Sequence, residues 1–120
     1  MSDRDRGIRS GGAFSWFFQR ISGVFLLLAL LVHFWVLHFS APDHGEITFG
    51  SVMERLNNPL WRAFDILFVV TAVYHAMNGA LLIVQDYIRA TGLRMIVVAG
   101  LWIGALYFLI VGSMTILGLA

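Results

Sequence analysis

The stretch ILFVVTAVYHAMNGALLIVQ, residues 66–85, carries no charged side chain. A helix rises about 1.5 Å per residue, so about 20 apolar residues cross the hydrocarbon layer of a bilayer. This stretch therefore has the length and the character of a membrane-spanning helix. Two further charge-free stretches, residues 21–42 and 95–120, lie on either side of it. Each is also long enough to span a bilayer, so the sequence predicts three transmembrane helices.

The composition agrees with this prediction. Hydrophobic residues make up 59% of the 120 residues and charged residues only 12%, whereas soluble domains carry about 25% charged residues. A soluble domain of this size has too much surface for its volume to hide such an apolar content. The expected fold class is an all-α membrane protein.

Charge and cysteine content exclude several kinds of function. The formal net charge is only +1, so the chain has no basic surface for nucleic acid. The absence of cysteine excludes disulfides, thiolate metal sites and covalent haem attachment within this chain. A cofactor held by this chain must use histidine, carboxylate or amide ligands.

We expect residues 1–12 to form an N-terminal segment and residues 13–120 to form one three-helix membrane anchor. The expected spans are residues 14–40, 62–87 and 93–118. Within the loop between the first two spans, the segment SVMERL is expected to form a short helix at the membrane interface.

The arginines predict the orientation of the three spans. Six of the eight positive side chains fall on the side that holds the N-terminus: Arg4, Arg6, Arg9, Arg20, Arg89 and Arg94. Because positive residues concentrate on the cytoplasmic side, the N-terminus is expected in the cytoplasm.

The second expected span carries polar residues near its centre. Ionisable groups inside a membrane are costly, and each one is a candidate for function. His75, Asn78 and Asp86 share one helical stripe with Gly79, which leaves a gap against which a flat ring fits. A neutral imidazole in a dry interior is a good iron ligand, so the stripe fits haem b. The alternative is that His75 and Asn78 only form interhelical hydrogen bonds.

Three short motifs resemble a known family. They are Arg20-Ile-Ser-Gly-Val24, Tyr74-His-Ala-Met-Asn-Gly79 and Gln85-Asp-Tyr87. Together they resemble the small cytochrome b anchor subunits of succinate dehydrogenase (complex II), most closely the D-type hydrophobic membrane anchor of the bacterial enzymes. The resemblance covers residues 13–118. It implies that the three helices form half of a six-helix bundle completed by a second, C-type anchor.

The resemblance also implies roles for individual residues. It makes His75 an axial ligand of haem b, with the other ligand on the second anchor. It assigns Asp86 and Tyr87 to the pocket for ubiquinone or menaquinone, and Arg20 to the vicinity of the haem propionates and the quinone. Ser22 is expected to line the same pocket. The alternatives are an interfacial tyrosine at Tyr87 and a snorkelling side chain at Arg20.

His33, in the first span, has two interpretations. Some relatives hold two haems, with one histidine from the first span and one from the second, which makes His33 a candidate ligand of a second haem. The other interpretation is a hydrogen-bonded packing residue.

The implied function is electron transfer from an iron–sulfur subunit to membrane quinone. A flavoprotein subunit would oxidise succinate, for which this chain has no residues. The implied location is the inner (cytoplasmic) membrane of a bacterium. Alternatives are a fumarate reductase anchor, with electrons running in reverse, and a structural membrane tether without haem.

Overall fold

The computed structural model describes residues 12–40 and 46–119. All but the last residue of the expected N-terminal segment 1–12 lies outside the described residues. The described chain consists of four helices, which are α2 (Gly12–Phe39), α3 (Phe49–Asn57), α4 (Pro59–Tyr87) and α5 (Thr91–Ile116). Three of them, α2, α4 and α5, are long and apolar enough to cross a membrane. The all-α fold class with three spanning helices is confirmed.

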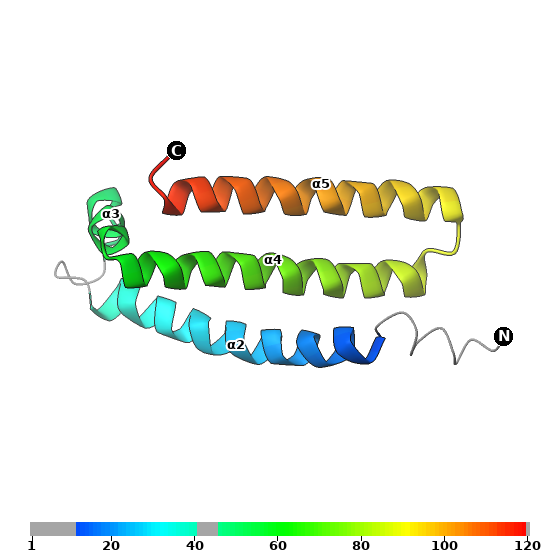
Figure 1. Cartoon of the computed structure of the whole chain (residues 1–120), viewed down its shortest axis with the longest axis horizontal. Coiled ribbons are helices and arrows are strands. Elements are labelled where there is room, and N and C mark those ends of the chain that lie inside the picture. The colour runs from blue at the N-terminus through cyan, green and yellow to red at the C-terminus, as the bar shows by residue number, and fades with distance from the viewer. Residues whose placement is uncertain (1–11, 41–45, 120) are drawn as a thin grey trace.

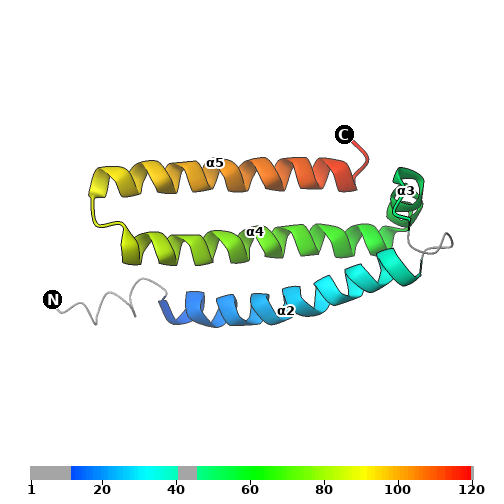
Figure 2. The same ribbon diagram turned by 180° about the vertical axis from the view of Figure 1, so that it is seen from behind.

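Helix α4 lies in the middle of the three long helices, with α2 on one side and α5 on the other (Figure 1). The view from behind shows the same order, with α3 at the end where α2 stops and α4 starts (Figure 2). The connection from α4 to α5 spans only residues 88–90, so these two helices run antiparallel. Helix α4 thereby becomes the only spanning helix whose two flanks are both covered within the described chain.

Most large apolar side chains remain exposed on the surface of the three long helices. The buried apolar residues are few and mostly single positions in each helix: Ala29, Leu56, Met77, Val84 and Ile116. Such a surface is unfavourable in water and favourable in lipid, where the hydrocarbon chains take the place of a protein core. The fold is that of a multi-pass membrane protein.

Local capping explains where α3 and α4 begin. Thr48 Oγ1 accepts a hydrogen bond from the backbone N–H of Ser51, whose hydroxyl in turn accepts one from the Thr48 N–H, which forms a capping box for α3. Asn58 Oδ1 accepts from the Leu60 N–H at 2.9 Å, and Pro59 occupies the first position of α4. The expected short helix in the loop is confirmed as α3.

Candidate functional site

Helices α2 and α4 meet along a polar seam. On α2 the seam contains Ser15, Gln19 and Ser22, whose spacing of four and three residues puts them on one helical face. On α4 it contains His75 and Asn78. We call these five residues the α2–α4 seam. Polar groups that face one another along it satisfy their hydrogen bonds without water, which is the arrangement that a membrane interior requires.

Asn78 forms the end of the seam nearer the start of α2. Its Oδ1 accepts a hydrogen bond from Ser15 Oγ at 2.6 Å, and its Nδ2 donates to Gln19 Oε1 at 2.8 Å and to the Ser15 carbonyl at 3.3 Å. Gln19 Nε2 donates to the His75 carbonyl at 3.2 Å. Asn78 and Gln19 therefore hold the backbone of α4 at His75 against α2.

The His75 ring lies against α2 at Ser22 and Gly23. The Ser22 hydroxyl oxygen is 2.9 Å from His75 Nδ1, and the same hydroxyl donates to the Gln19 carbonyl at 3.1 Å. A Cβ atom at Gly23 would lie 3.2 Å from His75 Cε1, which is tighter than ordinary contact. The absence of a side chain at Gly23 is thus what lets the imidazole lie across α2.

These residues fit one axial ligand of a haem. A porphyrin supplies four nitrogen ligands, so the protein needs to supply only axial ones, and one imidazole is enough from one chain. The contact with Ser22 engages His75 Nδ1, and Nε2 lies on the far edge of the ring. Within residues 12–40 and 46–119, histidine and carboxylate side chains nowhere gather in groups of three or more that would hold a bare metal ion.

The other expected site residues lie apart from His75. Arg20 is exposed, and its guanidinium carbon lies 3.8 Å from the centroid of the Trp16 ring. Because Arg20 and Ser22 are two residues apart on one helix, about 200° of rotation separates them, so Arg20 faces away from the seam. Asp86 and Tyr87 are exposed at the end of α4, about 16 Å along the helix from His75. Of the expected site residues, the structure brings together Ser22 and His75.

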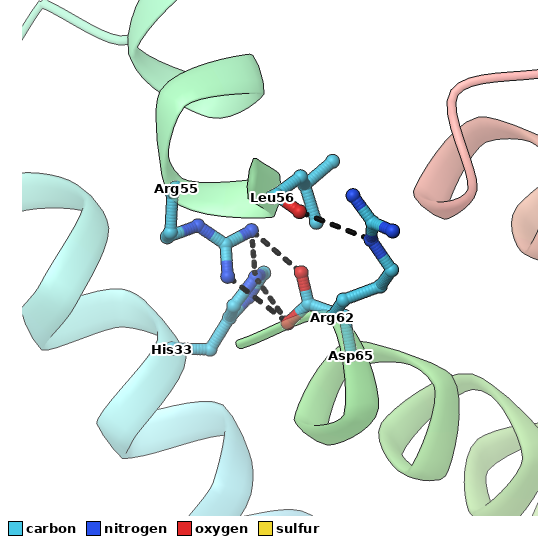
Figure 3. Close-up of polar contacts among 5 residues, drawn as sticks. All are labelled: His33, Arg55, Leu56, Arg62 and Asp65. Atoms are coloured by element: carbon cyan, nitrogen blue, oxygen red, sulfur yellow. Dashed lines mark hydrogen bonds and ion pairs between the residues drawn. The ribbon is translucent and has the colours of Figure 1, made fainter. Parts of the chain in front are cut away.

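His33 belongs to a second polar cluster, at the opposite end of α4. Arg55 of α3 and Asp65 of α4 form an ion pair, with Nη2 2.7 Å from Oδ2 and Nη1 donating to Oδ1 at 3.1 Å (Figure 3). His33 Nε2 lies 3.5 Å from Arg55 Nη2 and 3.8 Å from Asp65 Oδ1. The side chains of Arg55 and Asp65 are 12% and 9% exposed. We call these three residues the ion cluster.

The ion cluster joins α2, α3 and α4. His33 comes from the C-terminal third of α2, and its ring also lies 5.6 Å from that of Phe68, centroid to centroid. Arg62 adds a further link, since its Nε donates to the Leu56 carbonyl at 3.1 Å and so ties the start of α4 to α3 (Figure 3). The chain thus has a polar seam without Arg, Lys, Asp or Glu in the region of His75 and a charged cluster near α3.

Sequence reasoning assigned no role to four members of these groups, namely Ser15, Gln19, Arg55 and Asp65. The regular spacing of Ser15, Gln19 and Ser22 was a readable signal, because a polar stripe on an apolar helix marks a helix–helix contact. Asp65 offered a second signal, since a carboxylate inside a span needs a cationic partner. The identity of this cationic partner depended on the path of the loop, so it could not be predicted from the sequence.

Comparison with known proteins identifies the family. Residues 4–113 match the family described as "Succinate dehydrogenase/Fumarate reductase transmembrane subunit". The chain belongs to this family. The resemblance inferred from the three motifs is therefore confirmed, and membership in the family supports the role of a membrane anchor.

Individual proteins similar to this chain carry names that agree with the family. A "Succinate dehydrogenase hydrophobic membrane anchor subunit" of Thermoplasma acidophilum is 41% identical over 75 residues, which cover 62% of this chain and 60% of that protein. One of the same name from Archaeoglobus fulgidus is 31% identical over 72 residues, 60% of each chain. The "Succinate dehydrogenase cytochrome b558 subunit" of Bacillus subtilis is 28% identical over 67 residues, 54% of this chain and 33% of that protein. The match spans 60% of the length of the first two relatives.

Proposed function

We propose that this chain is the haem b- and quinone-binding membrane anchor of a succinate:quinone oxidoreductase. The observation that carries the proposal is the half-buried imidazole of His75, held by Ser22 within the α2–α4 seam. The name of the Bacillus subtilis relative, a cytochrome b558 subunit, supports a haem in this family. Fumarate reduction by the same kind of complex is the reverse direction of the same electron transfer.

In this proposal His75 Nε2 would hold the haem iron. A bound haem would supply a one-electron carrier, whose potential depends on its axial ligands and on hydrogen bonds to them. The second axial ligand would come from a C-type anchor, whose three helices would complete a six-helix bundle. Residues of this chain would orient the imidazole, exclude water and hold the backbone of α4 in place. Arg20, as a cation near the same level of the membrane, would pair with a haem propionate.

The quinone would bind at the end of α4 that carries Asp86 and Tyr87. The Tyr87 hydroxyl would donate a hydrogen bond to a quinone carbonyl, and Asp86 would pass protons to the reduced ring. We place this end in the cytoplasm of a bacterium, with the chain in the inner membrane, because positive residues concentrate there. An iron–sulfur subunit would deliver electrons at this surface, and a flavoprotein subunit would oxidise succinate.

The reduced-minus-oxidised absorption spectrum of the purified complex tests the proposal. A ligated haem b produces a sharp band in the α region and a Soret shift on reduction. A complex that contains this chain and its partners but lacks these bands would overturn the haem assignment. It would leave the structural tether as the function.

Neutralising Asp86 tests the proton route to quinone. Asp86→Asn keeps the size and the polarity of the side chain but removes its ability to exchange a proton, so we expect the rate of quinone reduction to fall by about tenfold or more. Electron transfer to an artificial acceptor at the flavoprotein should be unchanged. The measurement is the rate of succinate:quinone reductase against pH.

Glu54→Gln, an equivalent neutralisation of an exposed carboxylate on α3, is the control for Asp86→Asn and should leave the rate unchanged. An unaltered rate and pH profile in Asp86→Asn would remove Asp86 from the proton route.

Adding one methyl group at Gly23 tests the placement of the His75 ring. In Gly23→Ala the new Cβ would lie 3.2 Å from His75 Cε1, so the ring has to shift to relieve the close contact, which disturbs its hydrogen bond with Ser22. We expect about a tenfold or greater loss of haem content in the assembled complex, because a ligand displaced from its hydrogen-bond partner binds metal more weakly. The measurement is haem per complex by pyridine haemochromogen.

Gly112→Ala is a matched control for Gly23→Ala, since its Cβ would lie 3.2 Å from Val69 Cγ1 at the contact of α5 with α4. It introduces the same overlap between helices without touching His75. Equal haem loss in both variants would mean that the bundle, not the ring, responds to the added methyl group.

A further inference from the structure

The contact between Ser22 and His75 has consequences for the ligand itself. We propose that Ser22 is a positioning residue that fixes the tautomer and the orientation of His75, so that the Nδ1–H donates to the Ser22 hydroxyl and Nε2 is presented to iron. This role differs from the expected one, in which Ser22 lines a pocket near the propionates and the quinone. It rests on the proposed function of His75 as a haem ligand.

The hydrogen-bond inventory of Ser22 selects the tautomer. The hydroxyl has one proton, and two groups lie within hydrogen-bond distance of its oxygen, namely the Gln19 carbonyl at 3.1 Å and His75 Nδ1 at 2.9 Å. The hydroxyl donates to the Gln19 carbonyl oxygen, which can only accept. The contact with His75 is then satisfied only if Nδ1 carries a proton and donates it to Ser22. In a neutral imidazole this leaves the lone pair on Nε2.

The surroundings of Ser22 protect this arrangement. Ser22 is 6% exposed, so water does not compete for its hydroxyl. Gly23, the next residue, provides the space beside the ring, and Gln19 Nε2 holds the His75 carbonyl at 3.2 Å. Two consecutive residues of α2 thus fix the ring, and a third fixes the backbone that carries it. In the Arg-Ile-Ser-Gly motif, the serine thus bonds the His75 ring and the glycine makes room for it.

A hydrogen bond from Nδ1–H makes the imidazole a stronger electron donor to a metal at Nε2. A stronger donor stabilises ferric over ferrous iron, so loss of the hydrogen bond should raise the reduction potential of the haem. Loss of an outer hydrogen-bond partner weakens metal binding about 10- to 100-fold. A tenfold loss of ferric over ferrous affinity corresponds to about 59 mV for one electron.

The experiment is a potentiometric titration of haem b in the purified complex, together with low-temperature EPR of the ferric state. Ser22→Ala removes the acceptor, and Ser22→Thr keeps a hydroxyl at the same position. Ser15→Ala removes an equivalent hydroxyl from the same seam, one that contacts Asn78 and not the His75 ring. We expect a higher potential and altered g values in Ser22→Ala, with values near those of the native complex in Ser22→Thr and Ser15→Ala.

An unchanged potential and EPR spectrum in Ser22→Ala would overturn the proposal, as would equal shifts in Ser22→Ala and Ser15→Ala. If Ser22→Ala does not assemble, Ser22→Cys decides by the same criteria, because its thiol fills the space but accepts hydrogen bonds weakly. Failure of this inference is distinguishable from failure of the proposed function. A native complex without haem bands overturns the function, whereas a haem-containing complex indifferent to Ser22 overturns only the positioning role.

Discussion

Replacing His75 with leucine is expected to abolish the haem b bands of the complex while the three helices still insert and assemble. Leucine has similar volume and cannot ligate iron. It also introduces no polar group into the membrane interior, and the Ser22 hydroxyl keeps its acceptor at the Gln19 carbonyl. The helix contact therefore survives although the ligand is lost. Haem per complex is measured by its reduced-minus-oxidised spectrum, and assembly by the yield of the intact complex.

His33→Leu is the matched control and also counts the haems. In the ion cluster, His33 Nε2 faces Arg55 and Asp65, and we therefore expect His33→Leu to keep all of the haem. Loss of half of the pigment in this variant would instead establish a second haem with His33 as a ligand. Full retention of haem with an unaltered potential in His75→Leu would remove His75 from the site.

Removing Arg55 is expected to destabilise the fold strongly. Arg55→Ala leaves the Asp65 carboxylate, 9% exposed, without its bidentate partner. Breaking a buried ion pair by deleting one member costs about 3–5 kcal/mol, because the remaining charge is buried without compensation. We expect a decrease of this order in the free energy of unfolding, measured by denaturant titration of the detergent-solubilised complex with helicity as the signal.

Two comparisons separate the ion pair from other effects. Arg62→Ala removes one arginine from the same end of α4 but only a single hydrogen bond to a backbone carbonyl, so it should cost about 1 kcal/mol. The double variant Arg55→Leu with Asp65→Leu removes both charges and should recover most of the stability, because replacing a buried pair by apolar residues is often neutral. A double variant as unstable as Arg55→Ala would show that the lost charge pairing is not the cause.

The three charge-free stretches were enough to predict α2, α4 and α5. Crossing a bilayer demands a long apolar helix, and few other structures meet that demand. The short helix α3 was also predicted, because a turn-rich loop confined its position. The sidedness of the membrane and the partner subunits stay predictions, since they depend on components outside this chain.

The residues that meet at the candidate site were predicted in part. His75 was identified because an ionisable side chain in the middle of an apolar, membrane-spanning stretch is costly and therefore indicates a function. Its contact with Ser22 and Gly23 was not predicted, because the motif containing them lies far from His75 in the sequence. Helical periodicity says which residues share a face of one helix, but it does not set how two helices are rotated against each other. The ion cluster was not predicted for the same reason, because Arg55 and Asp65 lie on different helices.

The α2–α4 seam determines how the first two spanning helices are rotated against each other. Lipid tails are as apolar as leucine, so apolar contact does little to choose one rotation of α2 over another. The polar seam does favour one rotation, because turning α2 by one residue, about 100°, would carry its three polar side chains away from their hydrogen-bond partners on α4. The rotation of α2 against α4 is therefore determined by residues of these two helices. The contacts that position the His75 imidazole are thus supplied by α2 and α4 alone.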